Sequence, residues 1–217
     1  MHKHLKPLLA AMWCIALLFS TQAAFAHPHV WVTARSQLVF EANKLTAIRH
    51  SWTFDPAYSK YAIQGLATNP DGTINAEELA DLARLNVENL HEFDYFTKAK
   101  ANGKALAFTN PIEPSITLKD DALTLHFTLP VDLPAQANRT LALEVYDPTY
   151  FVSFVFAPEQ DAVNVVGTPS KCAVTITRPK QQNFNEQEEL SEAFFNALTT
   201  ASSFGQDFAT RAIVACP

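Results

Sequence analysis

Short stretches with the composition of β-strands recur along this chain of 217 residues, and turn residues separate them. Residues 29–40 alternate between apolar and polar side chains, which is typical of a strand with one buried face. A second strand is expected over residues 45–54, so that the first two form a hairpin. Further strands are predicted at residues 96–101, 104–108, 115–118, 123–129, 140–146, 151–156, 162–166 and 172–177, with a short closing strand that ends at Cys216.

Two predicted helices interrupt this succession of strands. The first begins at Asp55-Pro56, with Asp as the N-cap and Pro in the first turn, and runs to about residue 66. The second, over residues 76–91, carries leucines at helical spacing. A last helix is expected over residues 187–199. The order predicts an α+β protein, mainly an antiparallel β-sandwich with an EF-hand-like helix-loop-helix inserted at about residues 55–92 and a C-terminal helix.

The first 26 residues have the three parts of a secretory signal peptide. Lys3 and Lys6 form a basic start, an apolar run follows over residues 8–20, and Ala24-Phe25-Ala26 forms a small-x-small cleavage site. The apolar run is shorter than the roughly 20 residues that a bilayer span needs. We therefore expect a single periplasmic domain, residues 27–217, that does not span the membrane after cleavage.

The charge of the chain is acidic, with a formal net charge of −6. Losing Lys3 and Lys6 with the signal peptide takes the charge from −6 to −8. An acidic chain without a cluster of Lys and Arg is a poor candidate for binding nucleic acid or anionic lipid.

The cysteines agree with export. Removal of Cys14 with the signal leaves Cys172 and Cys216, an even pair in an oxidising compartment, and we expect a disulfide between them. A metal site built on the two thiolates is the rival interpretation. It is disfavoured because neither cysteine has a neighbouring His or Cys in the sequence.

The cleavage site is followed directly by His27-Pro28-His29. Cleavage would make His27 the first residue and would bring its α-amine together with the two imidazoles. Nitrogen-rich ligation suits copper(II), and zinc and nickel also accept imidazole. Pro28 has no N–H to lose, so chelation through deprotonated backbone amides is excluded. The alternative is that both histidines form a frayed, solvated end.

Three further residues are candidates for the same metal site. His50 lies on the predicted partner strand and is the first candidate, and His126, on the strand at 123–129, is the second. Asp147 belongs to Tyr146-Asp147-Pro148-Thr149-Tyr150, which repeats the pattern of Phe54-Asp55-Pro56-Ala57-Tyr58. A helix cap explains Asp55 adequately and a turn explains Asp147 adequately, so Asp147 is a weaker candidate for a metal ligand.

The loop between the two inserted helices resembles a calcium-binding loop of the EF-hand type. Aligned on Gly72, it offers a degenerate ligand set: Asn69, Asp71, Thr73, Asn75 and Glu78. Ala67 replaces the usual first Asp, and Pro70 stiffens the fourth position. Asn75 with Glu78 also matches a capping box for the second helix. We expect weak calcium binding or none.

Sequence patterns of common enzyme classes are missing from the chain. It contains no Gly-rich phosphate loop, no Gly-x-Ser-x-Gly elbow and no His-Glu-x-x-His pair. No catalytic residue is predicted.

The sequence resembles a bacterial family over essentially the whole mature chain. The residues that carry the resemblance are His27-Pro28-His29-Val30-Trp31-Val32, His50-Ser51-Trp52-Thr53-Phe54-Asp55, Asn69-Pro70-Asp71-Gly72, Phe93-Asp94-Tyr95-Phe96-Thr97 and Glu144-Val145-Tyr146-Asp147-Pro148-Thr149-Tyr150-Phe151. The family is domain-of-unknown-function family 1007, also described as a periplasmic component of an ABC-type transport system. The resemblance implies a periplasmic protein encoded near transporters of nickel, cobalt or zinc. Its members often carry an Asp-x-Asn-x-Asp-Gly loop, from which Ala67 departs.

These observations favour an accessory protein that carries or buffers zinc, nickel, cobalt or copper for a membrane transporter. Two alternatives stay open. One is an oxidative copper enzyme that uses the N-terminal His as a ligand, and the other is a metal-free interaction module that docks a transporter.

Overall fold

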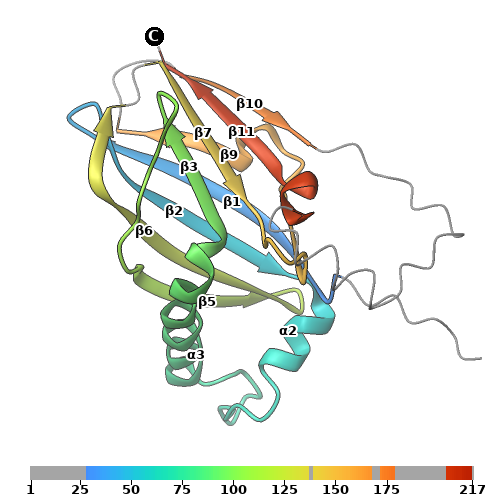
Figure 1. Cartoon of the computed structure of the whole chain (residues 1–217). Helices are drawn as coiled ribbons and strands as arrows, with labels where there is room; N and C mark the ends of the chain where they lie inside the picture. The colour runs from blue at the N-terminus through green and yellow to red at the C-terminus, as the bar shows by residue number, and fades with distance from the viewer. Residues whose placement is uncertain (1–27, 137–138, 168–171, 179–203, 217) are drawn as a thin grey trace, which may run out of the picture.

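Two β-sheets pack face to face in the computed structural model, which describes residues 28–136, 139–167, 172–178 and 204–216 (Figure 1). The larger sheet has the strand order β5-β6-β2-β1-β8, and β9 also pairs with β1. The smaller sheet has the order β10-β11-β7-β3-β4. The strands of the larger sheet are β1 Val30–Glu41, β2 Lys44–Phe54, β5 Ile112–Lys119, β6 Ala122–Gln136, β8 Val152–Phe156 and β9 Val163–Val166. Those of the smaller sheet are β3 Thr97–Ala101, β4 Lys104–Ala105, β7 Thr140–Val145, β10 Ala173–Thr177 and β11 Thr210–Ala215.

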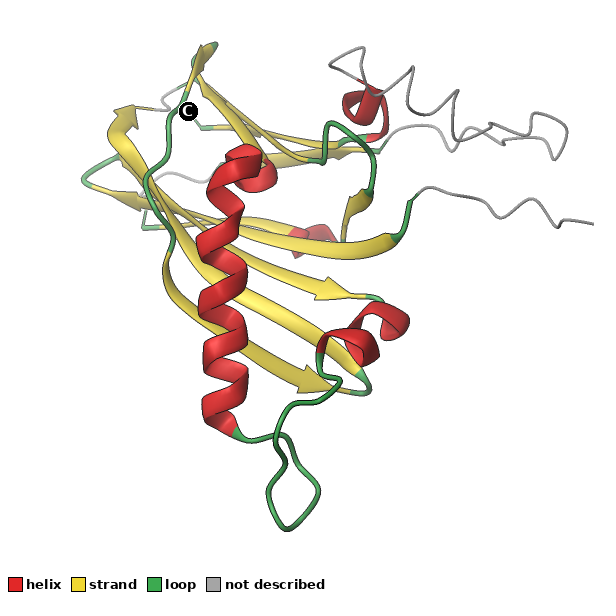
Figure 2. Cartoon of the chain, turned by 60° about the horizontal axis from the view of Figure 1, so that its bottom comes forward, coloured by secondary structure: helices red, strands yellow, loops and turns green. Residues whose placement is uncertain are grey.

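The two α-helices, α2 Pro56–Ala62 and α3 Ala76–Asn89, lie at one end of the molecule (Figure 1). The short 3₁₀ turns are η1 Leu90–Phe96, which follows α3, η2 Gln160–Ala162, which lies beside β1 between β8 and β9, and η3 Phe204–Phe208, which precedes β11. Figure 2 shows α3 running across the strands, and it contacts β5 and β6. Ala83 and Val87 of α3 are buried there. No helix in the described part of the chain is long and apolar enough to cross a membrane.

The core lies between the two sheets and centres on Trp52, which is 1% exposed. Its ring packs against Phe96, Phe127 and Phe154, which come from η1, β6 and β8. The alternation of buried and exposed positions along β1 sends Val32, Ala34 and Leu38 into this core. Apolar and polar residues therefore alternate along β1 because one face of the larger sheet is buried in the core and the other is exposed.

The expected fold class is confirmed as α+β with a sandwich-like arrangement of two sheets. Three details differ from the sequence prediction. β8 and β9 pair with β1 in the parallel direction, because the chain crosses from β7 in the small sheet back to the edge of the large one. The strand expected at 104–108 spans only Lys104–Ala105, and α2 ends at Ala62 rather than near residue 66. The helix expected at 187–199 lies outside the described residues.

Candidate metal site at the start of the first strand

The start of β1 lies between two Asp-Pro turns. β1 pairs with the end of β2 on one side, where Val32 lies opposite Phe54, and with the start of β8 on the other, where Val30 lies opposite Val152. The matching phrases at residues 54–58 and 146–150 therefore flank the same point of the fold, although they are far apart in the sequence. Figure 1 shows this end of β1 near α2.

Asp55 joins β1 to α2. One carboxylate oxygen accepts hydrogen bonds from the backbone N–H groups of Ala57 and Tyr58, both at 2.9 Å, which makes Asp55 the N-cap of α2. The other oxygen accepts the N–H of Trp31 at 3.0 Å. Because the carboxylate already takes three donors, its first role is to fix the path of β1.

Asp147 stabilises the turn that leads into β8, the strand that pairs with the other side of β1, and it is only 5% exposed. Its Oδ1 accepts the N–H and the hydroxyl of Thr149, each at 2.8 Å, and its Oδ2 accepts the N–H of Val152 at 3.0 Å. Gly205 of η3 packs so tightly on this turn that a Cβ there would collide with the Asp147 carbonyl oxygen. The turn explanation of Asp147 thus accounts for its carboxylate fully.

Replacing Asp147 with Asn is expected to destabilise the protein by about 2–3 kcal/mol, since a buried carboxylate with three donors would become an amide with one acceptor oxygen. Urea unfolding of the variant measures this loss. Asp132→Asn, which changes an exposed carboxylate of β6, is the matched control and is expected to change stability by less than about 0.5 kcal/mol. Equal losses in the two variants would contradict the turn role.

His29 lies at the rim of this region and is exposed. Its backbone N–H donates to the Phe151 carbonyl oxygen at 2.9 Å, and its ring lies 4.6 Å from the Phe151 ring, centre to centre. The imidazole is therefore held at the start of a fixed strand. His27, the other predicted terminal ligand, lies outside the described residues.

His50 lies in the core, 1% exposed, and its ring connects the two sheets. Nδ1 lies 3.0 Å from the Ser36 hydroxyl of β1, and Nε2 lies 3.3 Å from the Thr97 hydroxyl of β3. Thr97 donates its proton to the Tyr95 carbonyl oxygen at 2.8 Å, so its oxygen accepts from His50 Nε2–H. Nδ1 then accepts from Ser36. Burial lowers the pKa of His50 to about 3, and the ring stays neutral.

The structure does not bring His50 to His29. His50 pairs with Ser36, which lies seven residues along β1 from His29, or about 23 Å at the usual rise of a strand. With both ring nitrogens already hydrogen-bonded in the core, His50 serves the packing of the two sheets.

His126 lies on the opposite face of the larger sheet from His50. Its Nδ1 is 2.9 Å from the Ser51 hydroxyl, and its Nε2 is 3.0 Å from the Thr117 hydroxyl. Desolvation lowers the pKa of this half-buried ring as well. The ring links β2, β6 and β5, and neither His29 nor His50 joins it.

The degenerate calcium-type loop is folded by its own side chains. Asp71 accepts the N–H of Thr73 at 2.9 Å and its hydroxyl at 2.6 Å, and these bonds lower the pKa of Asp71. Asn69 donates to the Thr73 hydroxyl at 3.0 Å. Asn75 caps α3 by accepting the Glu77 N–H at 2.8 Å, and Glu78 stands in the first turn of that helix. Within the described ranges, no group of three or more His, Cys, Asp or Glu residues is arranged to hold a metal ion.

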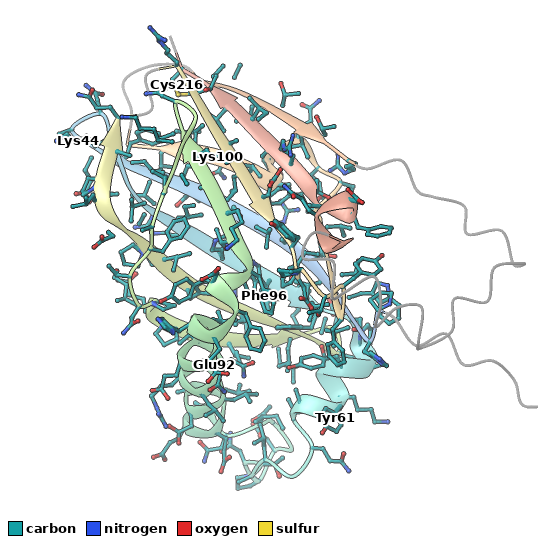
Figure 3. The ribbon with its side chains drawn as sticks, in the orientation of Figure 1. Lys44, Tyr61, Glu92, Phe96, Lys100 and Cys216 are labelled. Atoms are coloured by element: carbon teal, nitrogen blue, oxygen red, sulfur yellow. A yellow bond between two sulfur atoms is a disulfide. The ribbon has the colours of Figure 1, made fainter. Side chains whose placement is uncertain are left out.

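The expected disulfide is confirmed between Cys172 and Cys216. It joins the ends of β10 and β11, where Ala173 lies opposite Ala215. Figure 3 labels Cys216 at the end of the molecule remote from α2. The thiolates are therefore bonded to each other, and the rival metal site built on them is wrong.

A family model described as "Protein of unknown function (DUF1007)" matches residues 11–216. The chain belongs to the DUF1007 family. An uncharacterised protein of Haemophilus influenzae is 26% identical over 205 residues, which cover 92% of this chain and 95% of that protein. An uncharacterised 15.5 kDa protein in the trpE 3' region of Spirochaeta aurantia is 31% identical over 88 residues, or 41% of this chain and 63% of that protein.

Three described histidines of this DUF1007 protein, all candidates for the metal site, differ in their surroundings. His50 and His126 each have both ring nitrogens next to hydroxyl groups, at positions where an imidazole links strands. His29 is exposed just before β1, whose Trp31 N–H donates to Asp55 and whose first residues pair with β8. The sequence did not lead us to predict Ser36 and Thr97 as the hydroxyl partners of His50. A polar residue at an inward-facing position of an alternating strand is the feature that could have indicated them.

Proposed function

We propose that this DUF1007 protein is a periplasmic accessory protein that binds a transition metal through its N-terminal histidines. It carries or buffers zinc, nickel, cobalt or copper for a membrane transporter, as a periplasmic component of an ABC-type system. The single observation that supports this site most is the position of His29, an exposed imidazole at the start of a fixed strand.

The chemistry of the site follows from the predicted cleavage before His27. Cleavage would free the α-amine of His27, so that one amine and two imidazoles would occur within the first three residues of the mature chain. The His29 N–H donates to the Phe151 carbonyl oxygen and the Trp31 N–H donates to Asp55, so the backbone at His29 is already fixed before a metal ion binds. Nitrogen ligands favour copper(II) over the other divalent ions in the usual affinity order.

A calorimetric titration with zinc, nickel, cobalt and copper tests this proposal on the mature protein that begins at His27. We expect His29→Ala to weaken binding of the preferred metal at least about a hundredfold, because one of three ligands is lost. His91→Ala removes another exposed imidazole, on η1, and should leave the affinity unchanged. One extra residue before His27 should also weaken binding, since it takes the amine away from the first imidazole.

Equal affinities for His29→Ala and the parent protein would overturn the site. A loss in His29→Ala without an effect of the extra residue would leave the two side chains as ligands and remove the α-amine. Binding that is lost in His91→Ala would place the metal on η1 instead.

A further inference from the structure

Two edge strands from different sheets lie beside each other at the side of the sandwich away from α3. Among the described strands, β9 pairs only with β1 and β10 pairs only with β11. β9 and β10 contact each other without forming a ladder (Figure 1). The sandwich therefore has a seam between β9 and β10 that no described ladder of hydrogen bonds closes.

A cleft of about 920 Å³ follows this seam. Part of its wall is aliphatic: Val163 and Val165 come from β9, and Val174 and Ile176 come from β10. Asn164 and Thr175 of the same two strands add polar groups. Val165, Val174 and Ile176 pack against the core but remain half-buried. Sites for small molecules in proteins have volumes of about 300–1,000 Å³, so the cleft has the size of a binding site, with a wall that is partly aliphatic and partly polar.

The two ends of the cleft differ in charge. Cys172 stands before β10 and Arg178 after it, six residues apart, so the cleft is about 20 Å long at the usual strand rise. Among the described lining residues, those at the Cys172 end carry no charged side chain, and Cys172 itself is in the disulfide. The Arg178 end carries charges of both signs.

Charged groups at the Arg178 end form a fixed arrangement. Arg178 donates to the Ala157 carbonyl oxygen at 2.6 Å, and a guanidinium has further N–H donors. Glu159 and Asp161 also line the cleft, and Arg35 bridges them at 2.6 and 3.0 Å. Counting Arg35, two cations and two anions meet there. This balance does not select a simple anion or a simple cation.

We propose that the cleft binds a single-chain amphiphile with a zwitterionic head, of the lysophospholipid type. Its chain would lie between β9 and β10 on Val165, Val174 and Ile176. The phosphate would face Arg178, since guanidinium groups suit phosphate oxygens. The ammonium group would face Glu159 and Asp161. This site is separate from the start of β1 and does not depend on the proposed metal function.

The test measures binding of dodecylphosphocholine to the mature protein by calorimetry, below the micelle concentration. Dodecanoate and dodecyltrimethylammonium supply the anionic and cationic heads with the same type of chain. We expect the zwitterion to bind about tenfold more tightly than either, because it alone satisfies both charges. Val174→Trp fills the cleft and should weaken all three ligands at least about tenfold. Val155→Trp, on the outer face of β8, is the matched control and should change nothing.

Arg178→Gln gives a second measurement that does not depend on a core substitution, since Arg178 is exposed. It should remove the preference for the zwitterion over the cation and leave chain binding intact. The proposal is overturned if dodecylphosphocholine does not bind, or if it binds Val174→Trp as tightly as the parent. Equal binding of the three heads would also reject it, since a hydrophobic surface alone would then explain the affinity.

Discussion

Acidification from pH 7 to pH 4 is expected to lower the free energy of unfolding by about 3 kcal/mol through His50 alone. The folded protein holds the pKa of His50 at about 3, whereas a solvated histidine has a pKa of 6.5. Between these two values the unfolded chain binds a proton that the folded protein does not bind. Stability therefore rises with pH across this window and falls as the pH drops through it. The full difference, reached near pH 3, is about 4–5 kcal/mol.

The physical cause is the position of the ring between the sheets. Protonation would place a charge beside Trp52 and Phe127, whose rings lie 5.4 and 5.1 Å from the ring of His50. It would also put a proton on Nδ1, where the Ser36 hydroxyl now donates. Both effects favour the neutral ring, and desolvation is the dominant one.

Urea unfolding of the parent protein and of His50→Gln at pH 7, 5.5 and 4 measures the contribution of His50 to the pH dependence of stability. Glutamine can hydrogen-bond to the same hydroxyls but does not titrate, so its stability should fall about 3 kcal/mol less between pH 7 and 4. The comparison concerns how the free energy of unfolding changes with pH. A loss of stability from imperfect packing that is the same at each pH therefore cancels. His91→Gln removes an exposed imidazole and should follow the parent. If the slopes of all three proteins were parallel, His50 would not be the group that titrates.

The hairpin of β1 and β2 illustrates how far the sequence determines the fold. The period of two over residues 29–54 and the turn near residue 42 predict both strands, and the structure confirms them. The same turn also determines the register. Glu41 pairs with Lys44 beside the turn, and counting away from it along both strands places His50 near Ser36. The distance of His50 from His29 was therefore predictable, although the candidate ligand set placed the two residues together.

Other features could not be derived from the pattern of residues. β8 and β9 reach β1 only after the chain has passed through the small sheet, and nothing local in residues 152–166 specifies a parallel partner. The pairing of Asp55 and Asp147 around β1 depends on that same crossover. Repetition of the Asp-Pro phrase predicted two turns, but only the topology shows that they flank the same strand.

Loss of the disulfide is expected to cost about 4 kcal/mol in the free energy of unfolding, near the upper end of the usual range. The bond between Cys172 and Cys216 closes a loop over a sequence separation of 44 residues. In the chain-entropy model a loop of that length restricts the unfolded chain by about 4 kcal/mol at 25 °C. The bond also stabilises the native state directly, because it fixes the start of β10, an edge strand whose described ladder runs only to β11.

The double variant Cys172→Ser and Cys216→Ser tests this by urea unfolding, beside the parent protein with and without a reductant. The reduced parent should match the variant, and the oxidised parent should be more stable by the stated amount. Amide exchange should increase first along β10, which loses its covalent tie at Cys172. Metal affinity at the start of β1 should not change, because the disulfide lies at the remote end of the fold. A loss below about 1 kcal/mol would mean that the β10–β11 ladder already restricts the chain without the bond.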